Sequence, residues 1–236
     1  MLKVFLPEQS EADINWIDGA KLVGTIEEAD AVLVTGGADI DPSLYGQKEH
    51  PLTSTYSYRD KRDWWLMENA EKQGKIILGI CRGLQAITVF AGGNLIQHVT
   101  GHGDSNHKTR IIPTGDDISI TTCHHQMCFP YPAQNKGWEV TILGCSNPAM
   151  SLRYEGEDRE NRIKEMETIE IDGKTMILEP EIIEFRKGKM RMWGIQGHPE
   201  WSDDRHSLER LNVLLKGFLD NTSPFSIYNP KLEVAS

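Results

Sequence analysis

A cysteine flanked by glycines is the feature of this sequence most able to do chemistry. The segment Gly79-Ile80-Cys81-Arg82-Gly83 lies between a continuous apolar run and a helical pattern. A Gly-x-nucleophile-x-Gly segment at such a junction predicts a sharp strand-to-helix turn, the nucleophile elbow, which lifts the side chain above the sheet. The thiol would also sit at a helix N-terminus, where the partial positive charge favours the thiolate. The N–H of Arg82 would point toward the same space and could stabilise an oxyanion.

A thiolate nucleophile needs a base, and the base needs a group that orients it. The best candidates are His198 and Glu200, in the segment Gln196-Gly197-His198-Pro199-Glu200. Pro199 favours an extended chain before it, and in an extended chain residues two apart point the same way. The two side chains are therefore expected at one site. The alternative interpretation is a buried His–Glu pair without a catalytic role.

A glycine pair follows an earlier apolar run. Gly36 and Gly37 come directly after residues 31–35, which predict a buried strand. Two glycines at the carboxyl end of a parallel strand allow a backbone N–H to face a ligand, and such a loop commonly supplies a second oxyanion donor. The alternative is an ordinary turn in which Asp39, Asp41 and Pro42 act as turn formers.

The elements that must position these residues alternate between strand and helix in the first half of the chain. Continuous apolar strands alternating with helices predict an α/β fold with a mostly parallel sheet covered on both faces. The expected strands are residues 3–6, 31–35, 75–80, 117–122, 138–143, 181–186 and 190–196, with a hairpin at 171–176. The expected helices are residues 60–73, 83–91 and 203–219. No repeat or linker interrupts residues 1–236, so we expect a single domain.

Composition excludes several classes of function. The 236 residues carry 25 Lys plus Arg against 35 Asp plus Glu, a formal charge of -10. That sign argues against nucleic acid and against anionic membrane surfaces as partners. No apolar run approaches the roughly 20 residues of a membrane span, and the first residues do not resemble a secretion signal. Four cysteines form no disulfide framework, so we expect a cytoplasmic protein.

The histidines and cysteines in the middle of the chain raise the question of a metal site. Residues 123–128 contain Cys123, His124, His125 and Cys128, and His98, His102 and His107 precede them. Structural zinc sites show spaced pairs that converge, and this cluster lacks a convincing second pair. We therefore expect pocket and core residues here, with no metal and no cofactor.

Three motifs together resemble one family. They are Thr35-Gly36-Gly37-x-Asp39-Ile40-x-Pro42, Gly79-Ile80-Cys81-Arg82-Gly83-x-Gln85 and Gln196-x-His198-Pro199-Glu200. In this order they resemble class I glutamine amidotransferase-like proteins, most of all the gamma-glutamyl hydrolase (peptidase C26) branch that includes gamma-glutamyl-GABA hydrolases. The resemblance spans residues 30–220. It implies a flavodoxin-like single domain with a nucleophile elbow.

The resemblance also implies roles for residues. Cys81 would be the nucleophile that forms a glutamyl thioester, His198 the base and acid, and Glu200 the group that orients His198. The release of glutamate and an amine would follow by hydrolysis. Further implied positions are an oxyanion hole (Gly37, Arg82) and a substrate pocket (Gly36, Gln85, His124, His125), without a choice between the two histidines.

Three departures from the family pattern stand out. The residue before the histidine is usually aromatic or bulky, and here it is Gly197, which would open the pocket or loosen His198. The segment before Gly36 is short, which would trim the first strands of the family. Residues 154–180 form a charged insertion that we expect to decorate the surface, with a partner contact or a substrate lid as alternatives.

Three functions remain open: a stand-alone hydrolase of a small gamma-glutamyl substrate, a glutaminase subunit that supplies ammonia to a synthetase partner, and a non-catalytic binding protein. Presence of all three residues of the implied triad argues against the last. Neither the leaving amine nor the oligomeric state follows from the sequence, and a homodimer stays open.

Overall fold

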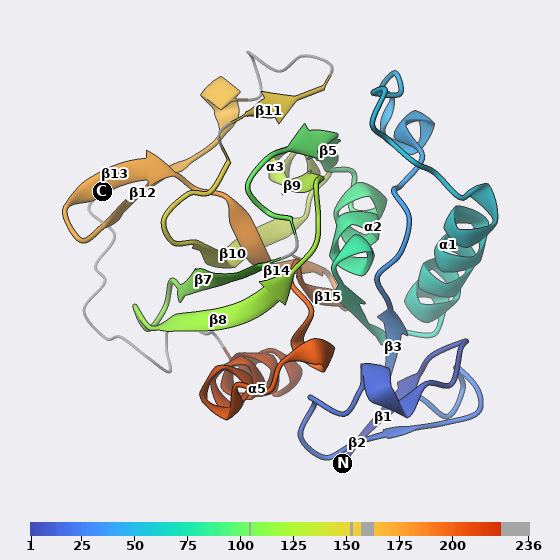
Figure 1. Ribbon diagram of the computed structural model, residues 1–236. Helices are drawn as coiled ribbons and strands as arrows, with labels where there is room; N and C mark the ends of the chain where they lie inside the picture. Colours follow the sequence, from blue (N-terminus) through green and yellow to red (C-terminus); the bar gives the residue numbers. More distant parts are fainter. Residues whose placement is uncertain (104, 152, 157–162, 223–236) are drawn as a thin grey trace.

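A nine-stranded sheet forms the centre of the protein (Figure 1). The structure is a computed structural model that describes residues 1–222 except 104, 152 and 157–162. The strand order is β2-β1-β3-β4-β15-β14-β10-β7-β8. The strands are β1 (Leu2–Phe5), β2 (Ala20–Leu22), β3 (Ala31–Val34), β4 (Ile76–Ile80), β7 (Ser105–Ile111), β8 (Asp117–Thr122), β10 (Glu139–Ser146), β14 (Pro180–Lys187) and β15 (Met190–Ile195).

The sheet has a parallel part and an antiparallel part. Strands β2, β1, β3, β4 and β15 run parallel, and β14, β10, β7 and β8 continue the sheet with antiparallel pairs. Strand β4 lies between β3 and β15, with Val34 beside Gly79 and Ile195 beside Ile80. The carboxyl ends of three parallel strands therefore meet, which is where ligands bind in open α/β sheets.

Helices cover both faces of the sheet (Figure 1). Helices α1 (Ser57–Lys72) and α2 (Arg82–Phe90) pack on one face, and α5 (Arg205–Leu219) packs on the other. The two faces separate along single strands: Val32 belongs to the first apolar cluster and its neighbour Leu33 to the second. The predicted α/β class with helices on both faces is confirmed. Among the described residues, no helix has the length and apolar character needed to cross a membrane.

Short elements surround the edge of the sheet above α2. Strand β5 (Asn94–Ile96) pairs with β9 (Met127–Phe129), and β6 (His98–Val99) pairs with β11 (Tyr154–Glu155). The predicted hairpin forms between β12 (Thr168–Ile171) and β13 (Lys174–Ile177). Three 3-10 turns, η1 (Glu11–Asp13), η2 (Pro42–Tyr45) and η3 (Pro199–Trp201), and the short α3 (Tyr131–Gln134) complete the described elements used below.

The charged insertion is more than the surface decoration expected from its sequence. Tyr154 and Met166 are buried in an apolar cluster with residues of β5 and β9, and Ile171 and Leu178 are buried in another. Residues 157–162, the most charged part of the insertion, lie outside the described residues. The described part of the insertion is therefore an integral part of the packing.

Candidate functional site

The predicted nucleophile elbow is present at Cys81. The residue has φ 52° and ψ −110°, between the end of β4 and the start of α2. A Cβ at Gly83 would lie 1.9 Å from the Val34 carbonyl oxygen, and one at Gly79 would lie 2.6 Å from the backbone of Gly83. Both glycines are therefore required by close backbone approach. A non-glycine residue in this conformation costs about 1–3 kcal/mol, and such strain is concentrated at functional sites.

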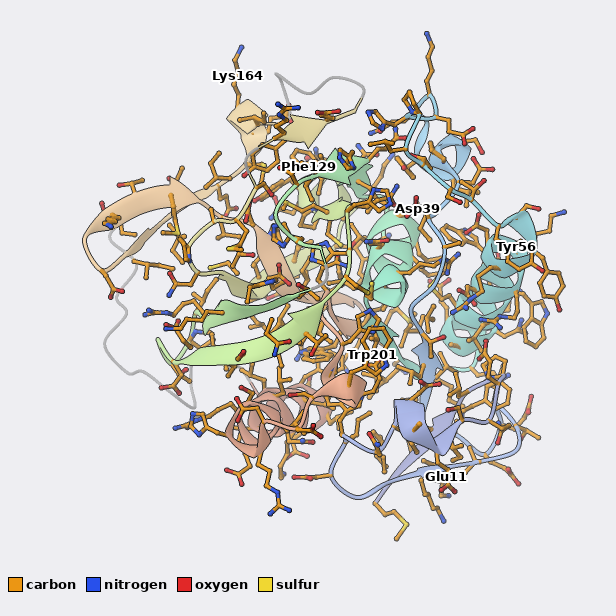
Figure 2. The ribbon with its side chains drawn as sticks, viewed as in Figure 1. Glu11, Asp39, Tyr56, Phe129, Lys164 and Trp201 are labelled. Carbon is orange, nitrogen blue, oxygen red and sulfur yellow. The ribbon has the colours of Figure 1, made fainter. Side chains whose placement is uncertain are left out.

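The Cys81 thiol lines a pocket of about 590 Å³ and is itself only 7% exposed. Asp39 and Trp201, which also line this pocket, are labelled in Figure 2. The pKa of this thiol lies well above its usual range, chiefly because the thiol donates a hydrogen bond to Cys123 and because it is buried. The backbone N–H of Arg82 also hydrogen-bonds to the sulfur and acts in the opposite direction, lowering the pKa. Without substrate, the pocket therefore holds a neutral Cys81 thiol, and the backbone N–H of Arg82 beside it can stabilise negative charge.

His198 and Glu200 form the expected pair. The His198 Nδ1 and Glu200 Oε1 atoms are 2.7 Å apart, and the His198 backbone N–H donates to the Thr121 carbonyl at 2.8 Å. Burial lowers the pKa of His198, but the hydrogen bond and charge of Glu200 outweigh it and raise the pKa above the usual value. The Trp201 ring stacks on the imidazole, with centroids 3.7 Å apart and planes at 2°. Sequence reasoning did not find Trp201, although it directly follows Glu200.

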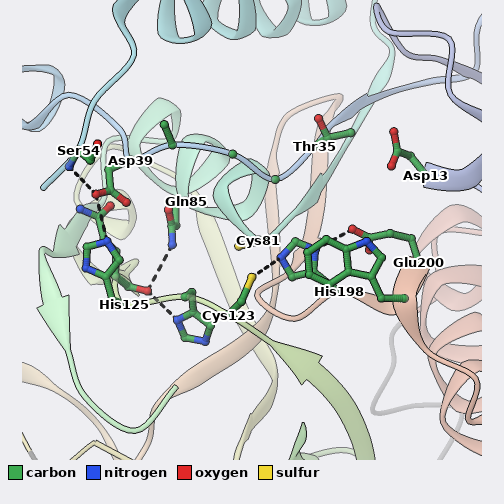
Figure 3. Close-up of a pocket in the computed structure, with 16 residues that line it drawn as sticks. Asp13, Thr35, Asp39, Ser54, Cys81, Gln85, Cys123, His125, His198 and Glu200 are labelled. Atoms are coloured by element: carbon green, nitrogen blue, oxygen red, sulfur yellow. Dashed lines mark hydrogen bonds and ion pairs between the residues drawn. The ribbon is translucent and has the colours of Figure 1, made fainter. Parts of the chain in front are cut away.

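Cys123 contacts both the nucleophile and the base, and Figure 3 marks its contact with His198. Its Sγ lies 3.3 Å from the His198 Nε2 atom, and it also hydrogen-bonds to Cys81. In the described part of the chain, no hydrogen bond joins His198 to Cys81. A Cβ at Gly36 would nonetheless lie 2.9 Å from the His198 ring and 3.8 Å from the Cys81 Cβ, so both side chains flank this glycine. The structure brings the three predicted triad residues to one pocket and adds Cys123.

The loop after β3 forms a second wall of the pocket. Gly36 and Gly37 line it, and Gly37 has φ 151°, a conformation that favours glycine. Arg59 of α1 holds the start of this loop, because its Nη2 atom donates to the Thr35 carbonyl at 2.9 Å and to the Thr35 Oγ1 at 2.7 Å. Arg59 is held in turn by Asp63, with Nε and Oδ2 atoms 2.9 Å apart. The loop is thus fixed by the neighbouring helix.

The Arg82 side chain has a structural place that sequence reasoning did not predict. It points away from the pocket, is 1% exposed, and forms ion pairs with Asp60 and Asp63 of α1. These two carboxylates are three residues apart and so share one face of the helix. This spacing of Asp60 and Asp63 is the feature of the sequence that could have indicated a site for a buried cation such as the Arg82 guanidinium. The ion pairs tie α1 to the first turn of α2.

The residues expected to bind substrate line the same pocket in different ways. Gln85 is buried, and its Nε2 donates to the Gln126 carbonyl at 3.3 Å. His125 is half-buried and lies 3.1 Å from the Asp39 carboxylate, which raises the pKa of His125. His124 is buried, its Nδ1 donates to the Gln126 carbonyl at 2.9 Å, and burial lowers its pKa to about 4. The more open imidazole of the two is therefore that of His125.

The expected effect of Gly197 is wrong. This residue does not line the pocket, and His198 is buried and paired rather than loose. A Cβ at Gly197 would lie 2.4 Å from the Ile120 Cγ2 atom of β8. The glycine is needed because β8 passes directly beside this segment.

Comparison with known proteins places this architecture in a family. Residues 14–133, about half of the chain, match the profile of the family described as Peptidase C26. The chain belongs to the peptidase C26 family. "Putative glutamine amidotransferase Rv2859c" of Mycobacterium tuberculosis is 32% identical over 144 residues, which are 52% of this chain and 44% of that relative. The match therefore spans less than half the length of that relative.

Two further similarities cover more of the chain. "Protein NtpR" of Enterococcus hirae is 25% identical over 207 residues, 78% of this chain and 72% of that protein. A solved structure from Thermoplasma acidophilum, described as a "putative gmp synthase subunit a protein", has a TM-score of 0.50 at 13% identity, and the match covers 93% of each chain. At that identity the likeness concerns the fold alone.

Proposed function

We propose that this member of the peptidase C26 family is a cysteine-dependent hydrolase of gamma-glutamyl amide bonds. The observation that carries the proposal is the elbow at Cys81 in one pocket with the His198–Glu200 pair. A strained nucleophile, a base within the same pocket and a carboxylate that orients the base are the parts that acyl transfer through a covalent intermediate requires.

The reaction divides into two steps. The Cys81 Sγ attacks the gamma-carbonyl carbon, His198 takes the thiol proton, and the amide C–N bond breaks as His198 protonates the departing amine. The glutamyl thioester is then attacked by water, which His198 deprotonates, and glutamate leaves as the thiol regains its proton. Glu200 holds the imidazole and stabilises the imidazolium formed in each step.

This reaction requires Cys123 to move. The His198 Nε2 atom contacts Cys123, whereas proton transfer needs it to reach Cys81. Cys123 is an exposed residue at the pocket wall, so rotation of its side chain on substrate binding would free the imidazole. Backbone N–H groups of Arg82 and Gly37 are the proposed oxyanion donors, because Arg82 already donates to the sulfur and Gly37 lines the same pocket.

Charged groups in the pocket suit the glutamyl half of the substrate. Asp39 and His125 carry opposite charges when paired and could receive the α-ammonium and α-carboxylate groups. Gln85 and Gly36 line the space between them and Cys81. His124 lines the pocket wall, but its imidazole is buried and hydrogen-bonded to the Gln126 carbonyl, so we do not assign it a contact with the substrate. This arrangement supports a small substrate.

The test is glutamate release from glutamine, gamma-glutamyl-GABA, gamma-glutamyl-putrescine and a gamma-glutamyl dipeptide. We expect turnover of at least one gamma-glutamyl amine, abolished in Cys81→Ala. Cys145→Ala, which removes a buried thiol outside the pocket, is the control and should retain activity. Absence of release from every substrate by the folded wild-type chain would refute the stand-alone hydrolase.

A second function, that of a glutaminase working with a separate synthetase, is favoured by the names of the relatives. The same pocket would then hydrolyse glutamine, with ammonia as the leaving group. The two are distinguished by whether turnover of glutamine needs a second protein, since the hydrolase acts alone.

A further inference from the structure

A second group of polar side chains lies inside the protein, beside the pocket wall. Its members come from four segments: His102 precedes β7, His107 lies on β7, His124 follows β8, and Glu179 and Glu181 lie at the start of β14. All five are buried. Of these residues only His124 lines the pocket, so the proposed hydrolysis leaves the others without a role.

Three imidazole nitrogens converge on one carboxylate oxygen. The Glu181 Oε1 atom lies 3.2 Å from the His107 Nε2 atom, 3.4 Å from the His102 Nδ1 atom and 3.8 Å from the His124 Nε2 atom. The three nitrogens face this oxygen as ion-pair contacts that lack good hydrogen-bond geometry. A bound cation would complete such a buried group of imidazoles and carboxylate.

The distances fit a tetrahedral metal centre. Zinc binds histidine nitrogen at about 2.0–2.1 Å and carboxylate oxygen at about 2.0–2.2 Å, so the corners of its tetrahedron lie about 3.3–3.5 Å apart. The three distances from Glu181 lie around that value. Ligand atoms of His102, His124 and Glu181 all lie within 4.8 Å of one another. His107 lies outside this group of three, although its Nε2 atom is 3.2 Å from the same oxygen.

The opposite nitrogen of each imidazole is held by another group. His102 Nε2 lies 3.2 Å from the Glu179 carboxylate, and His107 Nδ1 lies 3.1 Å from a threonine hydroxyl of β8. His124 Nδ1 lies 2.9 Å from the Gln126 carbonyl. Histidines that bind metal characteristically donate their other N–H to a carboxylate, carbonyl or similar acceptor, which fixes the ring and the tautomer. Here all three rings are oriented in that way.

The charges of the group are compatible with a dication. Glu179 and Glu181 are two buried carboxylates that His102 contacts at 3.2 and 3.4 Å, and a Zn²⁺ ion beside neutral imidazoles would compensate their charge in place of a protonated His102. Glu179 is itself fixed by the backbone N–H groups of Met150 at 2.6 Å and Ser151 at 2.9 Å, and by the Tyr154 hydroxyl at 2.7 Å. It is therefore built to orient His102 rather than to bind the ion.

We propose that His102, His124 and Glu181 bind a zinc ion, with His107 as a neighbouring imidazole beside Glu181. Imidazole and carboxylate ligands suit zinc. The sequence did not predict it because the carboxylate ligand lies on a distant strand, and the neighbouring Cys123 and Cys128 take no part. The ion fixes His124, and with it the segment that carries Cys123 to His198. It is a positioning element for the pocket wall.

The experiment measures metal in the full chain, purified without a polyhistidine tag. We expect about one zinc per chain by elemental analysis, and loss of most of it in His102→Gln and Glu181→Gln. His206→Gln removes an exposed imidazole of α5 and is the matched control, which should keep its zinc. A strong chelator should lower the melting temperature of the wild type and of the control.

The wild type alone keeps the proposal testable if the variants do not fold. Replacement of the ion by Co²⁺ should give the intense visible absorption of a tetrahedral site. A folded wild-type chain that binds no zinc when supplied with it, and whose melting temperature ignores the chelator, would overturn the site. Stoichiometric binding of another divalent ion in preference to zinc would overturn the assignment to zinc. None of these readouts depends on hydrolase activity.

Discussion

Replacing Cys123 by alanine should make Cys81 more reactive. The hydrogen bond that the Cys81 thiol donates to Cys123 is the largest of the effects that raise the pKa of Cys81, and Cys123 also contacts His198. A net hydrogen bond is worth about 0.5–1.5 kcal/mol, and one pKa unit corresponds to about 1.4 kcal/mol. Loss of the bond should therefore lower the pKa of Cys81 by roughly 0.4–1 unit.

The expected change in rate follows from that shift. The thiolate fraction near neutral pH rises about 2- to 10-fold, but a less basic thiolate is also a weaker nucleophile, with a Brønsted coefficient of about 0.4–0.5. The net increase in alkylation rate is roughly 2- to 4-fold. The rate is measured with iodoacetamide by mass spectrometry of the peptide that contains Cys81, because the exposed Cys123 also reacts in the wild type.

Cys123→Ser is the matched control, since its hydroxyl can replace the hydrogen bond and should keep the rate near that of the wild type. Cys145→Ala should also leave the Cys81 rate unchanged, because this thiol lies outside the pocket. An unchanged or slower rate at Cys81 in a folded Cys123→Ala variant would refute the assigned role of Cys123.

Three further changes test the framework of the site. Gly83→Ala places a Cβ 1.9 Å from a backbone oxygen of β3 and should destabilise the fold by about 3 kcal/mol or more in chemical denaturation, whereas Gly103→Ala, with open space around it, should cost little. Glu200→Gln removes the group that raises the pKa of His198. In the wild type, the interaction of Glu200 with protonated His198 stabilises the fold fully below pH 6.5, the usual pKa of histidine, and this stabilisation is lost as the pH rises through the pKa of His198 in the folded state. The drop in melting temperature should therefore be larger in weak acid than in alkali, and a drop independent of pH would contradict the pairing. Trp201→Ala should cost about 0.5–1.5 kcal/mol of stability, and Trp201→Phe less, because a ring stacks on His198.

The parallel half of the fold could be predicted from sequence because local patterns specify it. Strands β3 and β4 are continuous apolar runs, and each is followed by a glycine-containing segment that must turn. Once these strands are parallel, their carboxyl ends lie at one edge of the sheet. The proximity of Cys81, His198 and Gly36 follows from that topology.

The antiparallel half was harder to predict because its buried positions are polar. The sequence does not predict strand β7, because its buried residues include the polar His107 and Thr109, and burial therefore alternates along the strand without an alternation of hydrophobicity. Glu181 on β14 is likewise a buried polar residue whose burial its hydrophobicity does not indicate. Cys123 could not be placed beside His198 by any local pattern, because the contact joins two segments that are distant in the chain.

The hydrogen bonds from Arg59 to Thr35 affect the entropy change of ligand binding. Fixing one residue of a flexible loop costs about 1–2 kcal/mol of conformational entropy. Because helix α1 already holds the loop after β3, this cost is met during folding and not when a ligand arrives. Calorimetry of a bound glutamyl ligand should accordingly show a smaller entropic penalty in the wild type than in Arg59→Ala. Affinity at this pocket is thus partly determined by a side chain outside it.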